Sequence, residues 1–85
     1  MPEISRFYGI IVRMFFDEHN LPHFHVEYKE YKVSINLNDE VVKGFMPKRA
    51  LKLTFEWMEL HRDELFENWE KCQKGIKSSP IESLK

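Results

Sequence analysis

The sequence predicts an α+β fold, in which a small antiparallel meander of three to four strands is followed by one long C-terminal helix packed on one face. Three segments predict the sheet, because they are rich in aromatic and β-branched side chains and alternate in polarity. A longer segment without glycine or internal proline repeats apolar residues at helical spacing. The strand segments are residues 7–16, 23–28 and 31–37, and the helical segment is residues 47–74.

Composition limits what this fold can contain. The chain has 85 residues, enough for one domain, which we place at residues 1–75 with a flexible tail over 76–85. The net charge of −1 gives no global electrostatic case for nucleic acid, so such binding would need a local basic patch. Cys72 is the only cysteine, which indicates a reduced thiol. With no secretory leader and no membrane-length apolar run, we expect a cytoplasmic protein.

The first predicted strand, residues 7–16, is apolar on one face and nearly so on the other. This pattern indicates a central position in the sheet. Arg13 is the exception, and it should either reach solvent by its long stem or meet a carboxylate or ligand on the open face. The face assigned to the core contains Tyr8, Ile10, Val12, Met14 and Phe16. The other face contains Phe7, Gly9, Ile11 and Phe15 beside Arg13.

The next two strands should pair as a hairpin. A polar turn ends at Pro22, and Lys29-Glu30 then links residues 23–28 to residues 31–37. A two-residue hairpin loop normally uses glycine or asparagine to supply positive φ, and neither is present, so the type of turn stays open. Residues 40–45 offer a short fourth strand.

The long helix should begin at Pro47, which suits a first helical turn, and end before Gly75. His61 lies in the middle of its apolar stripe, so we expect a core histidine that is hydrogen-bonded to backbone or a carboxylate. The apolar arc is wide enough to suggest a larger sheet or a dimer interface. The stripe contains Ala50, Leu51, Thr54, Trp57, Met58, His61, Leu65, Trp69 and Cys72.

A candidate functional surface follows from strand parity in the segment His-Phe-His-Val at residues 23–26. His23 and His25 point to one side of their strand and Phe24 and Val26 to the other, so the histidines should lie on the face that the helix leaves open. Polar residues of the neighbouring strands should share this face. The predicted binding surface contains Arg13, His19, His23, His25, Glu27, Lys32, Ser34 and Asn36.

Three kinds of chemistry suit these residues, beside the plain interpretation that they are surface side chains. A metal ion could be bound by His23 and His25 with His19 or Asp17 as a third ligand, although we expect no metal or other cofactor. Phosphodiester cleavage would use His23 and His25 as general acid and base, with Arg13 and Lys32 nearby to stabilise the phosphate. Aromatic and polar side chains interleaved on an open sheet also suit a binding face, and the near-neutral charge favours a protein partner over nucleic acid.

Four parts of the chain carry a family pattern. They are the opening Pro-Glu-Ile-Ser-Arg-Phe-Tyr-Gly-Ile, the stretch His-Asn-Leu-Pro-His-Phe-His-Val, the run Pro47-Lys48-Arg49-Ala50-Leu51, and the pattern Trp57…Leu60-His61-Arg62…Leu65…Asn68-Trp69. From Met1 to about Gly75 the chain resembles the bacterial domain-of-unknown-function family 4160. Leu21 replaces a proline usual in that family and Lys29 a glycine, so both turns beside the histidine strand differ from its pattern.

The resemblance implies a small bacterial cytoplasmic protein, often encoded beside a second small protein in a pair that looks like a toxin–antitoxin module. It supplies no catalytic residues. We therefore expect a partner-binding protein that uses the open face bearing His23 and His25 to contact the product of the adjacent gene, or a second copy of itself. The alternative is a ribonuclease-type toxin enzyme, or a metal-binding protein, that uses the same histidines.

Overall fold

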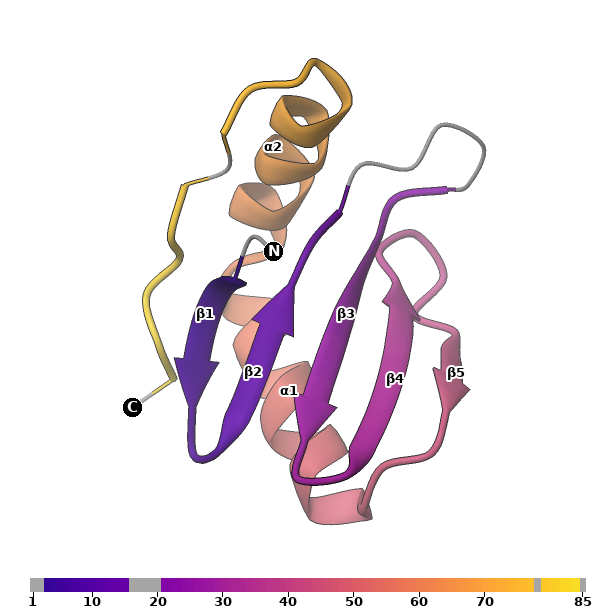
Figure 1. The fold of residues 1–85 in the computed structure, drawn as a ribbon. Coiled ribbons are helices and arrows are strands. Elements are labelled where there is room, and N and C mark those ends of the chain that lie inside the picture. The colour runs from indigo at the N-terminus through magenta and orange to yellow at the C-terminus, as the bar shows by residue number, and fades with distance from the viewer. Residues whose placement is uncertain (1–2, 16–20, 78, 85) are drawn as a thin grey trace.

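The computed structural model describes residues 3–15, 21–77 and 79–84, and it contains one antiparallel sheet with two helices. The strand order is β1-β2-β3-β4-β5, so each strand pairs with its neighbours in sequence. Helix α1 crosses behind the sheet in Figure 1, which leaves the other face toward the viewer. The α+β class and the meander are confirmed, but the numbers of strands and helices are not. The elements are β1 (Glu3–Phe7), β2 (Ile10–Arg13), β3 (His23–Tyr28), β4 (Tyr31–Asn36), β5 (Val42–Gly44), α1 (Lys48–Leu60) and α2 (Arg62–Gln73).

A tight turn at Tyr8-Gly9 divides the segment that the sequence predicts as one strand, residues 7–16. Both turn residues have positive φ, +49° and +79°, as a type I′ hairpin turn requires. The register then pairs Phe7 with Ile10, and both are buried on the helix side of the sheet. The prediction of Phe7 on the open face and Tyr8 in the core is therefore wrong, because the chain reverses through Tyr8 and Gly9 and leaves Tyr8 60% exposed.

β3 and β4 form the predicted hairpin, with a two-residue loop between the paired residues Tyr28 and Tyr31. In that loop Lys29 adopts a φ of +55°, which costs an L-residue about 1 kcal/mol and which glycine adopts freely. β5 adds a short fifth strand on the outer side of β4, within the predicted segment 40–45.

His61 interrupts the single helix predicted over residues 47–74. Its φ of −123° and ψ of 24° lie outside the helical region, so α1 ends just before it and α2 begins just after. Backbone hydrogen bonding continues across the break, because the His61 N–H donates to the Trp57 carbonyl at 3.1 Å. Asp63 and Glu64 in the first turn of α2 favour a new helix start, since negative charge is stabilised at a helix N-terminus.

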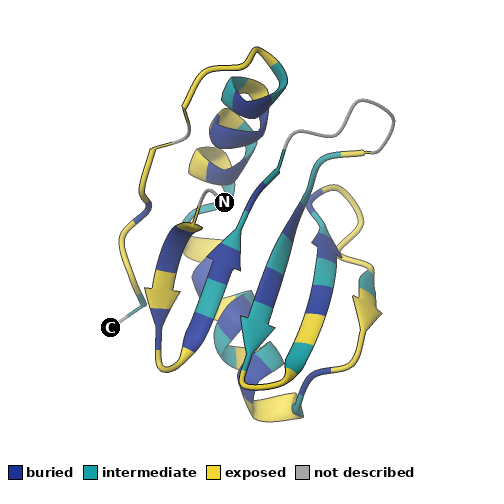
Figure 2. Cartoon of the chain, in the orientation of Figure 1, coloured by how far each residue is buried: buried dark blue, intermediate teal, exposed yellow. Residues whose placement is uncertain are grey.

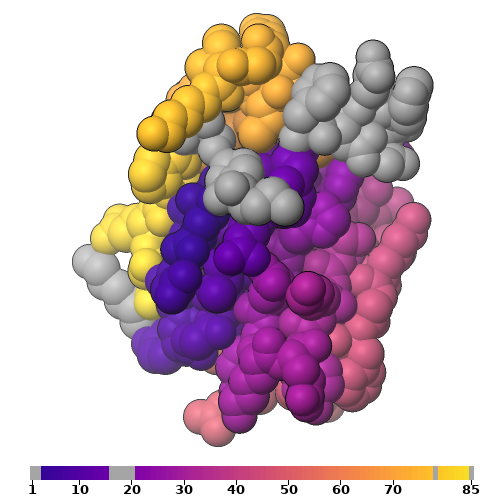
Figure 3. All heavy atoms as spheres, viewed as in Figure 1, coloured from indigo at the N-terminus to yellow at the C-terminus, as the bar shows by residue number. Residues whose placement is uncertain are grey.

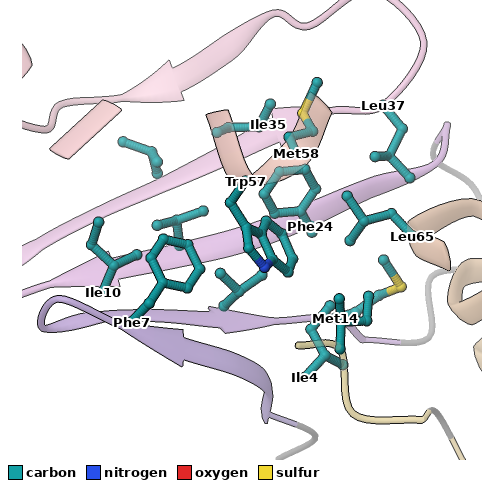
Figure 4. Packing of buried hydrophobic residues seen from close by; sticks show 14 of the residues in the cluster. Ile4, Phe7, Ile10, Met14, Phe24, Ile35, Leu37, Trp57, Met58 and Leu65 are labelled. Atoms are coloured by element: carbon teal, nitrogen blue, oxygen red, sulfur yellow. The ribbon is translucent and has the colours of Figure 1, made fainter. Parts of the chain in front are cut away.

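Trp57 of α1 lies at the centre of the hydrophobic core (Figure 4). Its side chain is fully buried, and its ring centroid lies 5.4 Å from that of Phe7 and 6.2 Å from that of Phe24. Buried residues alternate with less buried ones along β2, β3 and β4, as the stripes in Figure 2 show. Burial also raises the pKa of the Cys72 thiol, which agrees with a packing role. The buried helix residues are Ala50, Thr54, Trp57, Met58, Leu65, Asn68, Trp69 and Cys72.

Residues 79–84 lie against β1, in the region where the sequence predicts a flexible tail (Figure 1). The Ile81 N–H donates to the Ile4 carbonyl oxygen at 2.7 Å, and Ile81 is buried in the core cluster. The indole N–H of Trp57 donates to the Glu82 carbonyl oxygen at 2.9 Å. The tail thus covers the outer edge of β1 and supplies the hydrogen-bond partner that a buried tryptophan needs.

Gly44 should be far less tolerant of a side chain than Gly75, although both have positive φ. A Cβ at Gly44 would lie 2.5 Å from the Lys32 carbonyl oxygen, whereas a Cβ at Gly75 would meet nothing within 4 Å. Gly75→Ala should lower the free energy of unfolding by about 1 kcal/mol, from backbone strain alone. Gly44→Ala should lower it by about 3 kcal/mol, because β5 must also shift. Urea unfolding followed by tryptophan fluorescence measures both. Equal losses would contradict the close approach of β5 to β4.

Ile81 should contribute to stability as a core residue. Ile81→Ala should lower the free energy of unfolding by about 3 kcal/mol, because it leaves a cavity under a buried side chain. Ile76→Ala is the matched control, since Ile76 is 54% exposed and should cost less than about 0.5 kcal/mol. Thermal unfolding by circular dichroism gives both values. A loss for Ile81→Ala as small as that of the control would show that the tail does not dock in solution.

Candidate functional site

The strand register brings polar side chains of four strands into one row on the open face. Arg13 of β2 pairs with His25 of β3, and His25 pairs in turn with Ser34 of β4. Ser34 pairs with Lys43 of β5, which extends the row to the edge of the sheet. Neighbouring strands are about 4.8 Å apart, so adjacent members of the row are within reach of one another. Figure 3 shows the strands side by side across this face.

Glu27 lies between two cations. It pairs with Lys32 in the row next to that of His25 and Ser34. The Arg13 guanidinium forms an ion pair with the Glu27 carboxylate, and the Lys32 Nζ lies 3.9 Å from the other carboxylate oxygen. Only about a quarter of the Arg13 and Glu27 side chains is exposed, 27% and 25%, against 78% for Lys32. Arg13 therefore meets a carboxylate on the open face, one of the two arrangements predicted for it. Its Nε is buried without a hydrogen-bond partner in the described part of the chain.

His23 is fixed in orientation by its backbone neighbour. Its Nδ1 lies 2.8 Å from the Leu21 carbonyl oxygen, and because a carbonyl only accepts, Nδ1 must carry the proton. In the neutral ring Nε2 is then a hydrogen-bond acceptor. The ring centroid lies 5.1 Å from that of His25 and 5.2 Å from that of Trp69 of α2. His23 is thus half-buried and takes part in the contact between sheet and helix, which the sequence did not predict.

The imidazole ring of His25 packs against two other rings. Its centroid lies 4.8 Å from that of Phe15 and 5.1 Å from that of His23, both in edge-on geometry. Together with Trp69, which contacts His23, these side chains form a continuous aromatic series from the segment just after β2 to α2. The two histidines predicted as site residues therefore lie in contact, at the end of β3 nearest α2.

A hollow of about 330 Å³ lies beside the row, where β3 begins and the loop from β4 to β5 turns. The Asn36 Oδ1 accepts the backbone N–H groups of Asn38 and Asp39, and the Asp39 carboxylate accepts that of Val41, so these oxygens hold the loop. Lys43 has no ion pair among the residues that the structure describes. The lining residues are Leu21, His23, Ser34, Asn36, Asp39, Val41 and Lys43.

Apolar side chains border this polar hollow. Leu21 is 59% exposed and Val41 48% exposed, so both present apolar surface at the edge of the hollow. Leu21, Val41, Asp39 and Lys43 are not among the predicted site residues. Alternation through residues 40–45 would have placed Lys43 beside Ser34, but no local pattern shows that the loop folds back toward Leu21.

The predicted site residues fall into two groups. His23, Ser34 and Asn36 line the hollow, whereas Arg13, Glu27 and Lys32 form the charged group beside it. His25 lies in the row between them. The predicted residue His19 lies outside the described residues. Within residues 3–15, 21–77 and 79–84, no three His, Cys, Asp or Glu side chains are grouped as a metal site.

Two residues of the helical half bear on the site indirectly. The His61 Nδ1 lies 2.8 Å from a carboxylate oxygen of Glu64, a carboxylate partner of the kind expected for a core histidine. Arg62 was not selected from the sequence. It donates to the Glu40 carboxylate at 2.6 Å and to the Leu37 carbonyl oxygen at 3.2 Å, so it ties α2 to the loop that forms the hollow. The hydrogen bond to Glu40 raises the pKa of Arg62.

Comparison with known proteins gives one match. The sequence model of a family described as "Domain of unknown function (DUF4160)" matches residues 9–70, which is more than half of the chain. Comparisons with curated proteins and with solved structures returned no significant match. No helix among the described residues combines the length and apolar character needed to cross a membrane.

The neutral His23 ring should carry its proton on Nδ1. Nitrogen-detected NMR of the histidine side chains at a pH above the titration of the ring distinguishes the two tautomers. We expect the His23 Nδ1 to show the shift of a protonated nitrogen and Nε2 that of a bare acceptor. A ring protonated on Nε2 would show that the bond to Leu21 does not form in solution.

Proposed function

Because the chain belongs to the DUF4160 family, whose description names no activity, we propose its function from the open face: it is a protein-binding module whose partner docks over the hollow beside β5. The partner would be the small protein encoded by the adjacent gene. The two would form a toxin–antitoxin-like pair in the bacterial cytoplasm. The proposal rests on the surface described above and on no catalytic group.

One observation carries the proposal: exposed apolar side chains form the rim of a hollow whose polar lining residues are held by hydrogen bonds. Leu21 and Val41 expose large apolar side chains at the edge of a hollow, while His23 and Asn36 are held by hydrogen bonds within its lining. Protein interfaces commonly combine apolar contacts with a few oriented polar groups. Side chains that are already ordered lose little entropy on binding, so this surface is prepared for a partner.

The charges of the open face favour an acidic partner segment. The charge of Arg13 is neutralised by its ion pair with Glu27. The charge of Arg6 is neutralised by Glu3, whose carboxylate oxygen lies 2.8 Å from the Arg6 guanidinium. The hydrogen bond from Arg6 lowers the pKa of Glu3. Lys43 remains without an ion pair among the described residues. A carboxylate of the partner above Lys43 would complete the row and would steer association.

A phosphodiester-cleaving enzyme is the second candidate, and one observation favours it. The Nε2 of His23 is an acceptor in the neutral ring, as a general base requires, and Lys43 lines the same hollow as a cation for a phosphate. His25 would then act as the general acid. The binding module is preferred because its main features, the exposed Leu21 and Val41, contribute nothing to such chemistry.

The binding proposal is tested by co-expressing the tagged chain with the product of the adjacent reading frame. The wild-type chain should retain that product through affinity and size-exclusion chromatography as a stable complex. Val41→Asp places a charge in the apolar rim and Lys43→Glu reverses the unpaired cation, so each should weaken binding at least tenfold by calorimetry. Tenfold corresponds to about 1.4 kcal/mol, a typical cost for a central interface residue.

The controls lie on the helical side of the molecule. Leu60→Asp matches Val41→Asp, because Leu60 is 69% exposed, and Lys77→Glu matches Lys43→Glu. Both should leave the affinity unchanged within twofold. Loss of binding in Leu60→Asp with retention in Val41→Asp would move the interface to α1 and end the proposal. Chromatography of the chain alone reports whether a second copy occupies the face instead.

The enzyme candidate is separated by replacing both histidines. His23→Ala with His25→Ala should abolish RNA cleavage and growth inhibition if the chain is a ribonuclease. If the chain is a binding module, the wild type has no cleavage to lose and the double variant only weakens the complex. Cleavage of a radiolabelled RNA that disappears in the double variant would therefore replace the binding proposal with the enzymatic one.

A further inference from the structure

The charges of the chain are separated along its helical half, although its net charge is only −1. Residues 41–55 contain four cations and no acidic residue, whereas residues 56–70 contain six acidic residues and a single cation. Three of the four cations lie in the first part of α1 and make that end of the molecule basic, whereas the fourth, Lys43, lies in β5 beside the hollow. The cations of α1 in the basic segment, all exposed, are Lys48, Arg49 and Lys52.

A cavity of about 530 Å³ opens at this basic end. It lies where the turn from β1 to β2, the turn from β3 to β4 and the start of α1 come together at one end of the sheet (Figure 1). Two cations, Lys29 and Arg49, line it against one acidic residue, Glu30. The other lining residues are Tyr8, Ile10, Tyr28, Tyr31, Pro47, Ala50 and Leu53.

The lining of the cavity combines the rings of Tyr8, Tyr28 and Tyr31 with the cations Lys29 and Arg49. The Lys29 Nζ lies 5.4 Å from the centroid of the Tyr28 ring, and the ring of Tyr31 lies 5.5 Å from that of Phe45. Tyr8 in the lining is 60% exposed, and Phe45, which contacts Tyr31 but does not line the cavity, is 70% exposed. Exposed rings next to cations are the two elements by which proteins bind single strands, since rings stack on bases and cations contact phosphates.

The start of α1 adds a supporting observation. Its first turn contains Lys48 and Arg49 and no acidic residue, and no side chain caps it. Cations at a helix N-terminus oppose the helix dipole, so this arrangement lowers stability when the site is empty. A bound phosphate would remove the conflict, because it would neutralise the cations and lie at the positive end of the dipole.

We propose that this end of the molecule, formed by the two hairpin turns and the start of α1, binds single-stranded nucleic acid. A base stacks on the tyrosine rings of the cavity, and phosphates contact Arg49, Lys29 and the neighbouring lysines of α1. A nucleic acid fits better than an acidic protein segment because it supplies both bases, which stack on rings, and phosphates, which contact cations. The site lies at the opposite end of the sheet from the hollow, so it goes beyond the proposed function and does not depend on it.

The proposal is tested by fluorescence anisotropy with labelled single strands of mixed sequence about twelve nucleotides long, a length within known site sizes. RNA and DNA of the same sequence are titrated separately, with a duplex as a third probe. Arg49→Ala removes a cation that has no ion pair among the described residues. Tyr8→Asn removes a ring while keeping a residue that tolerates positive φ. Lys74→Ala is the control for loss of one exposed charge at the far end of the chain.

The wild type should bind single strands, and raising the salt from about 50 to 200 mM should weaken that binding. Arg49→Ala and Tyr8→Asn should each weaken it at least fivefold, and Lys74→Ala less than twofold, with circular dichroism confirming that every variant is folded. The ratio of the RNA affinity to the DNA affinity shows which of the two nucleic acids the protein prefers. The proposal is overturned by absence of binding at low salt, by duplex binding as tight as single-strand binding, or by an unchanged affinity in Tyr8→Asn, which would indicate charge attraction alone.

Discussion

The packing of Trp57 between the sheet and α1 is the contact on which the rest of the fold depends. Its ring contacts Phe7 of β1 and Phe24 of β3, so one side chain fixes the helix against two strands that are not neighbours. Its indole N–H bonds to the Glu82 carbonyl, which holds the C-terminal segment on the edge of β1. Because a buried ring of this size determines which side of the sheet is core, it also determines which side stays open.

The open face follows from that constraint through strand parity. With Phe24 committed to the core, the flanking residues His23 and His25 must project from the other side of β3, and the register aligns His25 with Arg13 and Ser34. The molecule then presents two different surfaces at opposite ends of the sheet (Figure 1). One is the hollow with its apolar rim, proposed to bind a protein, and the other is the cavity of tyrosines and cations, proposed to bind a single strand.

Much of the central sheet could be predicted from the sequence, because alternation over 23–28 and 31–37 reports burial directly. The turn at Tyr8-Gly9 could not, since its flanking residues are all apolar and periodicity does not distinguish a long buried strand from a tight hairpin. The break at His61 contains neither glycine nor proline, so no local residue marks it in the sequence.

The hollow and the docked tail depend on contacts between segments distant in sequence. Asn68 exchanges two hydrogen bonds with Ser79, and Arg62 forms an ion pair with Glu40, so neither partner is visible in a local pattern.

The most direct test of the open face as a binding surface is amide NMR of the labelled chain, titrated with the product of the adjacent reading frame. We predict that the changes in amide chemical shift are concentrated in residues 21–25 and 34–43. Changes concentrated in α1 and α2, with those two segments unaffected, would contradict it.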